Sequence, residues 1–332
     1  MATQIPQWPA MAETVDLPVV VGLGVVDPDL VSPVLHGRCR FVPEPTEADL
    51  AQARGAIARA DAVIDRAFLA RTPQLRVVAR TGVGVEKVDL EAATARGVAV
   101  VITPGAGTNA VAEGAIAMAM HLVKRFGRLT TLVRDGQWAS RGTVSVGDLG
   151  GATLGVVGYG RIGQRAGALG AALGMRVLAY DPVSEPPADV RCSDLQDLFD
   201  RSDVITLHLP LLDSTHHLVG TELLSAVKPG AILVNCGRGG LIDIDAVYTA
   251  LQDGRLGGVG LDVFDPEPPS HHPLFDHPDV VLTPHLMGLS RQGTAATFTD
   301  AAQGVLDVLT RTRPAAVANP GWETTTAPLG SS

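Results

Sequence analysis

One glycine-rich stretch, residues 155–182, limits what this chain can fold into more than any other segment. It reads GVVGYGRIGQRAGALGAALGMRVLAYDP, in which Gly158, Gly160 and Gly163 follow an apolar run and open a helical segment that leads to Asp181. A G-x-G-x-x-G pattern alone is weak in a chain with 37 glycines. Its position between a strand and a helix gives it weight. The stretch predicts a β–α–β unit with a ligand at its turn; the alternative is a glycine-rich turn with an aspartate at a strand end.

Each residue of this motif has a physical task in holding a dinucleotide. Gly158 permits the tight turn, Gly160 lets the backbone approach a pyrophosphate, and Gly163 lets the helix pack closely on the strand. The free N–H groups of the helix N-terminus attract the phosphates. Asp181 follows Gly163 by 18 residues, where its carboxylate can bind both ribose hydroxyls and repel a 2′-phosphate. We therefore expect an NAD site, with NAD preferred over NADP.

Short β-branched runs alternate with alanine-rich segments along the chain. One series lies at 19–24, 62–65, 77–81 and 98–102, and a second at 153–158, 176–180, 204–209, 231–235, 258–263 and 280–283. Runs of this length are typical of parallel strands buried on both faces. We predict an α/β protein with two Rossmann-like, doubly wound parallel-sheet domains. Residues 109–129 predict one long helix buried between domains or subunits, and the tail from Arg313 predicts irregular structure.

Composition and charge exclude several classes of partner. The chain is 46% hydrophobic and 18% charged, with a net charge of −9, so we expect no nucleic acid and no membrane as partners. No stretch reaches the roughly 18 apolar residues that a spanning helix needs, and the N-terminus does not resemble a signal peptide. Cys39, Cys192 and Cys236 are scattered, which is typical of a reducing compartment. We expect a cytoplasmic protein.

Three further residues follow strands of the second series. Arg238 comes just after the run at 231–235, Glu267 lies in the loop after 258–263, and His285 follows 280–283. The carboxyl ends of parallel strands share one edge of a sheet, so these side chains can converge on one crevice. Taken singly, Arg238 could be a surface residue, Glu267 a solvated one and His285 a helix cap. Together they predict a catalytic site beside the dinucleotide.

At these positions the chain resembles the D-isomer-specific 2-hydroxyacid dehydrogenases, most closely the 3-phosphoglycerate dehydrogenase branch. Other segments that carry the resemblance are VVARTGVGVEKVDLEAATARGVAV, TPGAGTNAVAEGAIAMAM, LHLPLLDSTHHLVG, NCGRGGLID, DVFDPEP and TPHLMG. The resemblance implies a flavodoxin-like substrate-binding domain from residues 1–107 with 293–332, and an NAD-binding domain from 108–292. It also implies a homodimer to which the helix from Asn109 contributes.

The resemblance assigns roles to individual residues. It implies that Arg238, Glu267 and His285 are catalytic. Further cofactor contacts that it implies are Arg161, Ile162, Pro210, Cys236 and Asp262. The backbone N–H groups of Val83 and Gly84 correspond to those that hold the substrate carboxylate.

Two arginines, Arg66 and Arg80, match positions that face the substrate phosphate in the phosphoglycerate dehydrogenase branch. We hypothesise that they bind a distal phosphate, phosphonate or carboxylate; the alternative is that they pair with acids such as Asp65 or Glu86. The chain also departs from the family pattern at Gly107, where asparagine is common, and at Met287, where a smaller residue is common. These two positions lie where substrate fit is decided.

The residue types predict hydride transfer between nicotinamide and a D-2-hydroxy acid/2-keto acid pair. His285 would exchange a proton with the substrate oxygen, Glu267 would fix its tautomer, and Arg238 would bind carboxylate and keto oxygen through its planar fork. The alternatives are a glyoxylate or hydroxypyruvate reductase and a corepressor-like protein that senses NAD. The histidine pairs at 216–217 and 271–272 lack completing ligands, so we expect no metal site.

Overall fold

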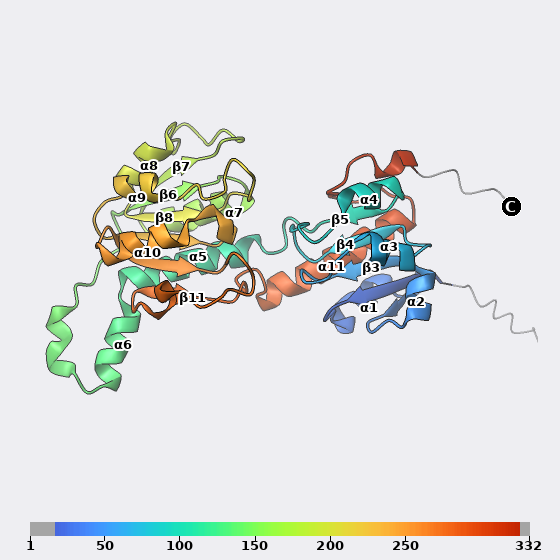
Figure 1. The fold of residues 1–332 in the computed structure, drawn as a ribbon, viewed down its shortest axis with the longest axis horizontal. Helices are drawn as coiled ribbons and strands as arrows, with labels where there is room; N and C mark the ends of the chain where they lie inside the picture. Colours follow the sequence, from blue (N-terminus) through green and yellow to red (C-terminus); the bar gives the residue numbers. More distant parts are fainter. Residues whose placement is uncertain (1–16, 326–332) are drawn as a thin grey trace, which may run out of the picture. The chain divides into compact units, whose positions relative to one another are not determined.

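The computed structural model describes residues 17–325, which form two compact units (Figure 1). The first unit comprises residues up to Pro104 together with those from Ala295 onward, and the second runs from Gly105 to Thr294. Each unit is built around one parallel β-sheet with helices on both faces. The predicted fold class, two doubly wound α/β domains, is therefore confirmed.

The first unit has a five-stranded parallel sheet in the order β2-β1-β3-β4-β5, which is the flavodoxin-like order. The strands are β1 (Val19–Leu23), β2 (Arg40–Val42), β3 (Ala53–Ala58), β4 (Val77–Arg80) and β5 (Ala99–Val101). One face of the sheet is covered by α2 (Glu47–Gln52), α3 (Arg66–Arg71) and α4 (Leu90–Ala95). The other is covered by α1 (Pro28–Leu35) and α11 (Arg291–Leu309). A short helix, η4 (Trp322–Thr325), follows.

The second unit has a six-stranded parallel sheet in the order β11-β10-β9-β8-β6-β7. Its strands are β6 (Thr153–Val157), β7 (Arg176–Tyr180), β8 (Val204–Leu207), β9 (Ala231–Asn235), β10 (Leu256–Leu261) and β11 (Val280–Leu282). One face packs against α5 (Thr108–Val123) and α7 (Arg161–Ala172). The other packs against α8 (Leu195–Arg201), α9 (Thr221–Ala226) and α10 (Ile244–Gln252). The remaining helices are α6 (Phe126–Arg134), η1 (Trp138–Thr143), η2 (Gly239–Leu241) and η3 (Pro273–Asp276).

One expected strand of the first unit was wrong, and two strands of its sheet, β2 and β3, were not predicted. The run at 62–65 contributes only an isolated bridge between Ile64 and Val88, while the strand in that part of the sheet is β3. The alanine-rich sequence of β3 is typical of a helix, but the strand is buried under α11. A Cβ at Gly55 in this strand would lie 2.7 Å from the side chain of Val305.

Residues 314–325 are more ordered than their proline-rich composition suggests, and the rest of the predicted irregular tail, 326–332, lies outside the described residues. The N–H of Ala318 donates to the carbonyl of Val100 at 2.8 Å, so the segment pairs with the free edge of β5. Asn319 is buried, and its Oδ1 accepts from the N–H of Val100 at 2.8 Å. Side-chain and backbone pairing with β5 therefore outweighs the low intrinsic order of the segment.

The expected single helix over 109–129 is two helices. α5 ends at Val123, Arg125 adopts a left-handed conformation with φ of 54°, and α6 begins at Phe126. α5 packs against α7, β9 and β10 of its own unit, whereas α6 has no buried residue. In Figure 1, α6 extends away from the sheet of its unit.

Candidate active site

The glycine loop after β6 has the geometry of a dinucleotide cradle. Gly158 has φ of 92°, and a Cβ there would lie 2.7 Å from the carbonyl carbon of His208. A Cβ at Gly163 would lie 3.0 Å from the carbonyl carbon of Gly158, so the start of α7 packs directly on the turn. At Gly160, in contrast, the same position faces open space with no atom within 4 Å. The loop is therefore closed on the protein side and open on the side where phosphates would approach.

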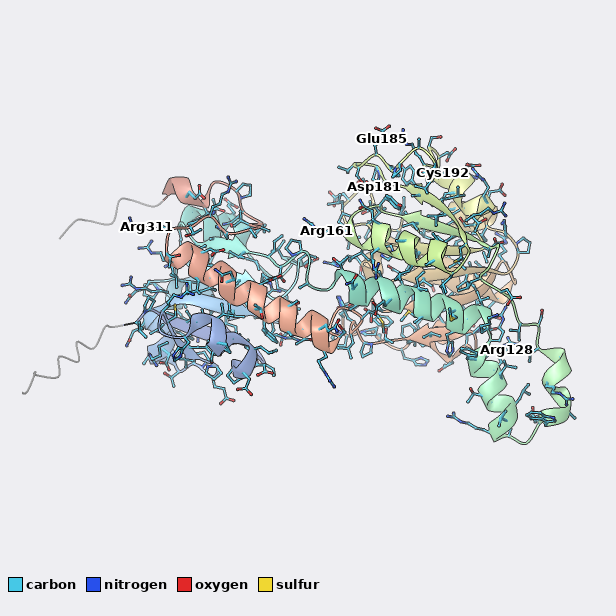
Figure 2. The ribbon with its side chains drawn as sticks, turned by 180° about the vertical axis from the view of Figure 1, so that it is seen from behind. Arg128, Arg161, Asp181, Glu185, Cys192 and Arg311 are labelled. Atoms are coloured by element: carbon cyan, nitrogen blue, oxygen red, sulfur yellow. The ribbon has the colours of Figure 1, made fainter. Side chains whose placement is uncertain are left out.

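The N-terminus of α7 completes this cradle. Gly160 is its N-cap, and no side chain caps the helix there, so its first-turn N–H groups are left for a ligand. Arg161 and Ile162 form the first turn, and Figure 2 shows Arg161 and Asp181 in the second unit. The loop lies at the carboxyl end of β6, between β8 and β7, where the strand order reverses. Ligands of open α/β sheets bind at this kind of switch point.

Asp181 follows β7 and is oriented by three backbone N–H groups. Its Oδ2 accepts from Tyr159 at 2.7 Å, and its Oδ1 accepts from Val183 and Ser184, both at 2.8 Å. Partial burial raises the pKa of Asp181, but the hydrogen bonds outweigh it and hold the pKa below its usual value. The group is therefore a fixed carboxylate at neutral pH, as recognition of ribose hydroxyls requires.

His285 and Glu267 form a hydrogen-bonded pair at the other side of the same sheet edge. Nδ1 of His285 lies 2.8 Å from Oε2 and 3.0 Å from Oε1 of Glu267, and the N–H of Phe264 donates to Oε1 at 3.0 Å. The side chains are 49% and 38% exposed, so the pair is open to a substrate. Because Nδ1 is engaged, Nε2 is the ring nitrogen that can exchange a proton with a ligand. A mostly apolar pocket of about 340 Å³ adjoins the pair, lined by residues 264, 267–269 and 282–285.

Asp262, expected to contact the cofactor, holds the loop that carries His285. It is 2% exposed and directly follows β10. Its Oδ1 accepts from Oγ1 of Thr283 at 2.6 Å and from the N–H of Leu286 at 2.9 Å, while Oδ2 accepts from the N–H of Met287 at 3.1 Å. His285 itself adopts φ of 54°, a left-handed conformation that a non-glycine residue seldom holds without such support. Sequence reasoning missed this positioning role.

Arg238 is held by a buried asparagine that the sequence analysis did not single out. Asn235, the last residue of β9, is fully buried, and its Nδ2 donates to the carbonyl of Arg238 at 2.9 Å. Its Oδ1 accepts from the N–H of Gly237 at 3.0 Å, which closes the turn. A Cβ at Gly239 would lie 2.6 Å from the backbone nitrogen of Asp265. The loops after β9 and β10 therefore touch, which places Arg238 and Glu267 on neighbouring loops.

The other expected cofactor residues lie along the same edge. Pro210 is exposed in the loop after β8. Cys236 is buried, and burial together with the Asp262 charge raises the pKa of its thiol to about 12. It is therefore a neutral thiol and no nucleophile at neutral pH. Two residues before Pro210, burial lowers the pKa of His208 to about 4, so this imidazole is neutral too.

In the first unit, the loop of Val83 and Gly84 is organised by Arg80. Arg80 is 3% exposed, and its guanidinium donates to the carbonyls of Arg59, Ala60, Ala62 and Gly84 at 2.6–3.2 Å. These bonds disfavour the hypothesis that Arg80 binds a distal anion, because the backbone engages four of its five N–H donors. Val83 is 47% exposed, in keeping with a backbone that a ligand can reach.

Arg66 has a different environment. Its side chain is 74% exposed, and its Nε lies 3.2 Å from Oδ2 of Asp89. The paired acid is thus neither Asp65, which caps α3, nor Glu86. An exposed ion pair of this kind contributes only about 0–1 kcal/mol, so Arg66 can exchange its partner.

The histidine pairs have structural partners. The rings of His216 and His217 stack with centroids 3.9 Å apart, and His272 bonds to Asp245 at 3.1 Å. Over residues 17–325 there is no group of three or more His, Cys, Asp or Glu residues that could hold a metal ion. In the same residues, no helix is both long enough and apolar enough to span a bilayer.

The comparisons with known proteins agree with this geometry. Residues 116–287 match the model of the D-isomer specific 2-hydroxyacid dehydrogenase family, NAD binding domain. The chain belongs to this family. The second unit therefore contains its NAD-binding domain, and the loop, the helix N-terminus and Asp181 fit that cofactor.

Relatives of this dehydrogenase family member include enzymes with different substrates. The chain is 36% identical to D-3-phosphoglycerate dehydrogenase of Methanocaldococcus jannaschii over 76% of this chain and 49% of that protein. It is 38% identical to hydroxypyruvate reductase of Thermotoga maritima over 64% of this chain and 70% of that protein. The chain spans about half the length of the phosphoglycerate dehydrogenases that it matches.

Solved structures are similar to this chain over most of its length. D-lactate dehydrogenase of Aquifex aeolicus, complexed with NAD and lactic acid, matches with a TM-score of 0.76 and 28% identity over 88% of this chain and 96% of that chain. A Thermus thermophilus protein matches with a TM-score of 0.80 and 36% identity over 91% of this chain and 100% of that chain. The resemblance seen in the sequence is thus confirmed at the level of family and fold.

Proposed function

We propose that this protein is an NAD-dependent D-2-hydroxyacid dehydrogenase. The observation that carries the proposal is the His285–Glu267 pair at the same sheet edge as the dinucleotide loop. A hydrogen-bonded imidazole–carboxylate pair is suited to proton exchange with a hydroxyl or carbonyl oxygen. When bound, NAD supplies the hydride acceptor or donor.

The chain's own residues supply binding and proton transfer. Arg238, held by Asn235, binds the substrate carboxylate and the oxygen at C2 through its guanidinium fork. His285, protonated, gives its proton to that oxygen during reduction and takes it back, from the hydroxyl, during oxidation. Glu267 orients the ring and stabilises the imidazolium. The N–H groups of Val83 and Gly84 are the proposed second contact for the substrate carboxylate.

For the substrate we propose a 2-hydroxy acid with a distal anion, of the 3-phosphoglycerate type. Arg66 supports this because it is exposed and shares only a surface ion pair with Asp89. The phosphoglycerate dehydrogenases among the relatives support it too. A hydroxypyruvate or glyoxylate reductase is the second candidate, since Arg80 is committed to the backbone and a relative is named for hydroxypyruvate.

We also propose that the protein forms a homodimer in the cytoplasm. α5, expected to contribute to the interface, is largely covered within its own unit, so α6 and η1 are the better candidates. Phe126, Val133 and Trp138 in this region are 49%, 62% and 64% exposed. Apolar groups of this size gathered on a protruding segment are typical of an interface. The cytoplasmic assignment rests on the sequence alone.

A panel of 2-keto acids tests the proposal. NADH consumption is followed with phosphohydroxypyruvate, hydroxypyruvate, glyoxylate and pyruvate. We expect turnover of at least one, with phosphohydroxypyruvate preferred, and Arg66→Ala should raise KM for that substrate by about 10-fold while leaving pyruvate unchanged. Preference for an unphosphorylated acid would favour the second candidate. NADH binding without turnover of any 2-keto acid would instead favour a nucleotide-sensing protein.

A further inference from the structure

A cavity of about 230 Å³ adjoins Asp181, beyond the end of β7. It is lined by residues 180–186 and 191–193. Asp181, Glu185 and Cys192 are labelled together at one edge of the second unit in Figure 2. The segment of Arg191 runs beside β7, because Arg191 bridges Ala179. If NAD binds as proposed, this cavity lies next to the 2′ position of the adenine ribose.

The carboxylate of Asp181 occupies an anion cradle made of backbone. The N–H groups of Tyr159, Val183 and Ser184 all point to it, at 2.7–2.8 Å. Backbone donors that converge in this way bind phosphate as readily as carboxylate. Asp181 therefore does two things: it presents negative charge to the ribose, and it fills a site that a phosphate could take.

The wall of the cavity contains one cationic side chain, Arg191, and its charge is neutralised by the carboxylate of Glu185. Arg191 is the only Lys or Arg among the lining residues; its Nε donates to the carbonyl of Pro186 at 2.9 Å, and its Nη1 pairs with Glu185. The side chains of Arg191 and Glu185 are 38% and 75% exposed. Glu185 thus holds the guanidinium and brings a second carboxylate to the cavity.

We propose that Glu185 is a specificity-determining residue against 2′-phosphorylated nucleotides, acting together with Asp181. The lining side chains carry two carboxylates and one guanidinium, so a dianionic 2′-phosphate meets net negative charge. Without Asp181 and Glu185, the same wall presents three backbone donors and a released Arg191. The cavity is then a 2′-phosphate site. This inference rests on the proposed NAD function and extends it to a pair of residues, Glu185 and Arg191, that the glycine motif does not include.

Binding measurements with four variants test this. The variants are Asp181→Ala, Glu185→Gln, the double variant that combines these two changes, and a triple variant that adds Arg191→Gln. Each is titrated with 2′,5′-ADP and 5′-AMP by calorimetry, and with NADPH and NADH by fluorescence. Relative to Asp181→Ala, the double variant should gain about 10-fold in its preference for 2′,5′-ADP over 5′-AMP, the worth of one charge-assisted hydrogen bond. The triple variant should lose that gain.

A charge-matched control separates local contact from net charge. Glu222, exposed in the first turn of α9 and absent from the cavity wall, is changed to Gln in the Asp181→Ala background. This variant should keep the Asp181→Ala preference within about 2-fold, because Glu222 does not line the cavity and salt screens the interaction of an exposed charge with a ligand there.

Two results would overturn the inference. One is a double variant whose preference equals that of Asp181→Ala or of the control; the other is a triple variant that keeps the gain. Glu185→Gln alone, a surface change, guards against a folding artefact and should weaken the wild-type preference for NADH over NADPH by about 3-fold or more. An unmodified protein that binds neither NADH nor 5′-AMP would refute the proposed function itself, which is a separate outcome.

Discussion

Replacing Gly114 by alanine should destabilise the wild-type protein but stabilise a variant in which Met287 is also replaced by alanine. Gly114 lies inside α5, and Met287, two residues after His285, fills the space beside it. A Cβ at Gly114 would lie 2.8 Å from Cγ and 3.2 Å from Cβ of Met287, and closer still to its Sδ. The chain thus pairs a helical glycine with the bulky side chain of a methionine. Met287 also donates its N–H to Asp262, so its position is tied to the loop of His285.

Two opposing effects determine how Gly114→Ala changes the free energy of unfolding. Replacing a helix-interior glycine by alanine stabilises by about 0.5–1 kcal/mol. Forcing a methyl group against Met287 costs about 1–3 kcal/mol, since both its Cγ and its Cβ are too close. We expect a net loss of about 1–2 kcal/mol in the wild-type background. With Met287→Ala present, the methyl group has space, and Gly114→Ala should stabilise by about 0.5–1 kcal/mol.

Urea unfolding of the four proteins in this double-mutant cycle gives the coupling, expected at about 2 kcal/mol. The kcat should fall in Gly114→Ala and recover in the double variant, while NADH affinity stays constant. Gly167→Ala in α7 is the matched control, since a Cβ there meets its nearest atoms at an ordinary 3.4 Å. Equal stability changes from Gly114→Ala in both backgrounds would refute the packing argument.

Three other changes have expected outcomes. Arg80→Leu leaves buried carbonyls without donors and should lower the free energy of unfolding by about 2–4 kcal/mol in urea titrations, with activity on phosphorylated and unphosphorylated substrates reduced alike. Burial lowers the pKa of His208 to about 4, so its imidazole stays neutral in the folded protein down to about that pH. In the unfolded chain the same imidazole binds a proton below about pH 6.5. The free energy of unfolding should therefore fall as the pH drops from about 6.5 to 4. Urea unfolding at about pH 7 and about pH 4.5 measures this loss of stability, which should reach up to about 3 kcal/mol. The loss should be smaller in His208→Asn, and an equal loss in both proteins would contradict the role of His208. Asp262→Asn loosens the loop of His285 and should lower kcat by about 10-fold or more, measured by NADH consumption at saturating 2-keto acid and NADH.

The sequence predicted those parts of the molecule that local chemistry determines. The turn at Gly158 needs a positive φ, and the apolar strands of the second unit are bounded by glycines and polar residues, so both can be seen in the sequence. Strand β3 could not, because its small residues are explained only by α11, which follows more than 200 residues later. The roles of Asn235 and Asp262 were missed for a similar reason. Each side chain bonds to backbone of a loop, and no spacing rule reports such bonds.

The environment of Arg80 could not be predicted from the sequence. The match of Arg80 to a phosphate-facing position of the family led to the hypothesis of an anion site, yet the carbonyls of Arg59, Ala60 and Ala62 converge on its guanidinium from the preceding loop. Burial lowers the pKa of this guanidinium, but the hydrogen bonds satisfy its donors. Only the three-dimensional path of that loop distinguishes it from Arg66, which is exposed.

The central claim is that His285 exchanges a proton with the substrate while NAD exchanges a hydride, and chiral analysis of the product tests it most directly. Purified protein is incubated with NADH and the best substrate among phosphohydroxypyruvate, hydroxypyruvate and pyruvate, whose reduction products are chiral, and the hydroxy acid is resolved by chiral chromatography. We expect the D-isomer, with one NADH consumed per product, and none from His285→Ala, which should still bind NADH with unchanged affinity. Formation of the L-isomer, or undiminished turnover by His285→Ala, would contradict this account.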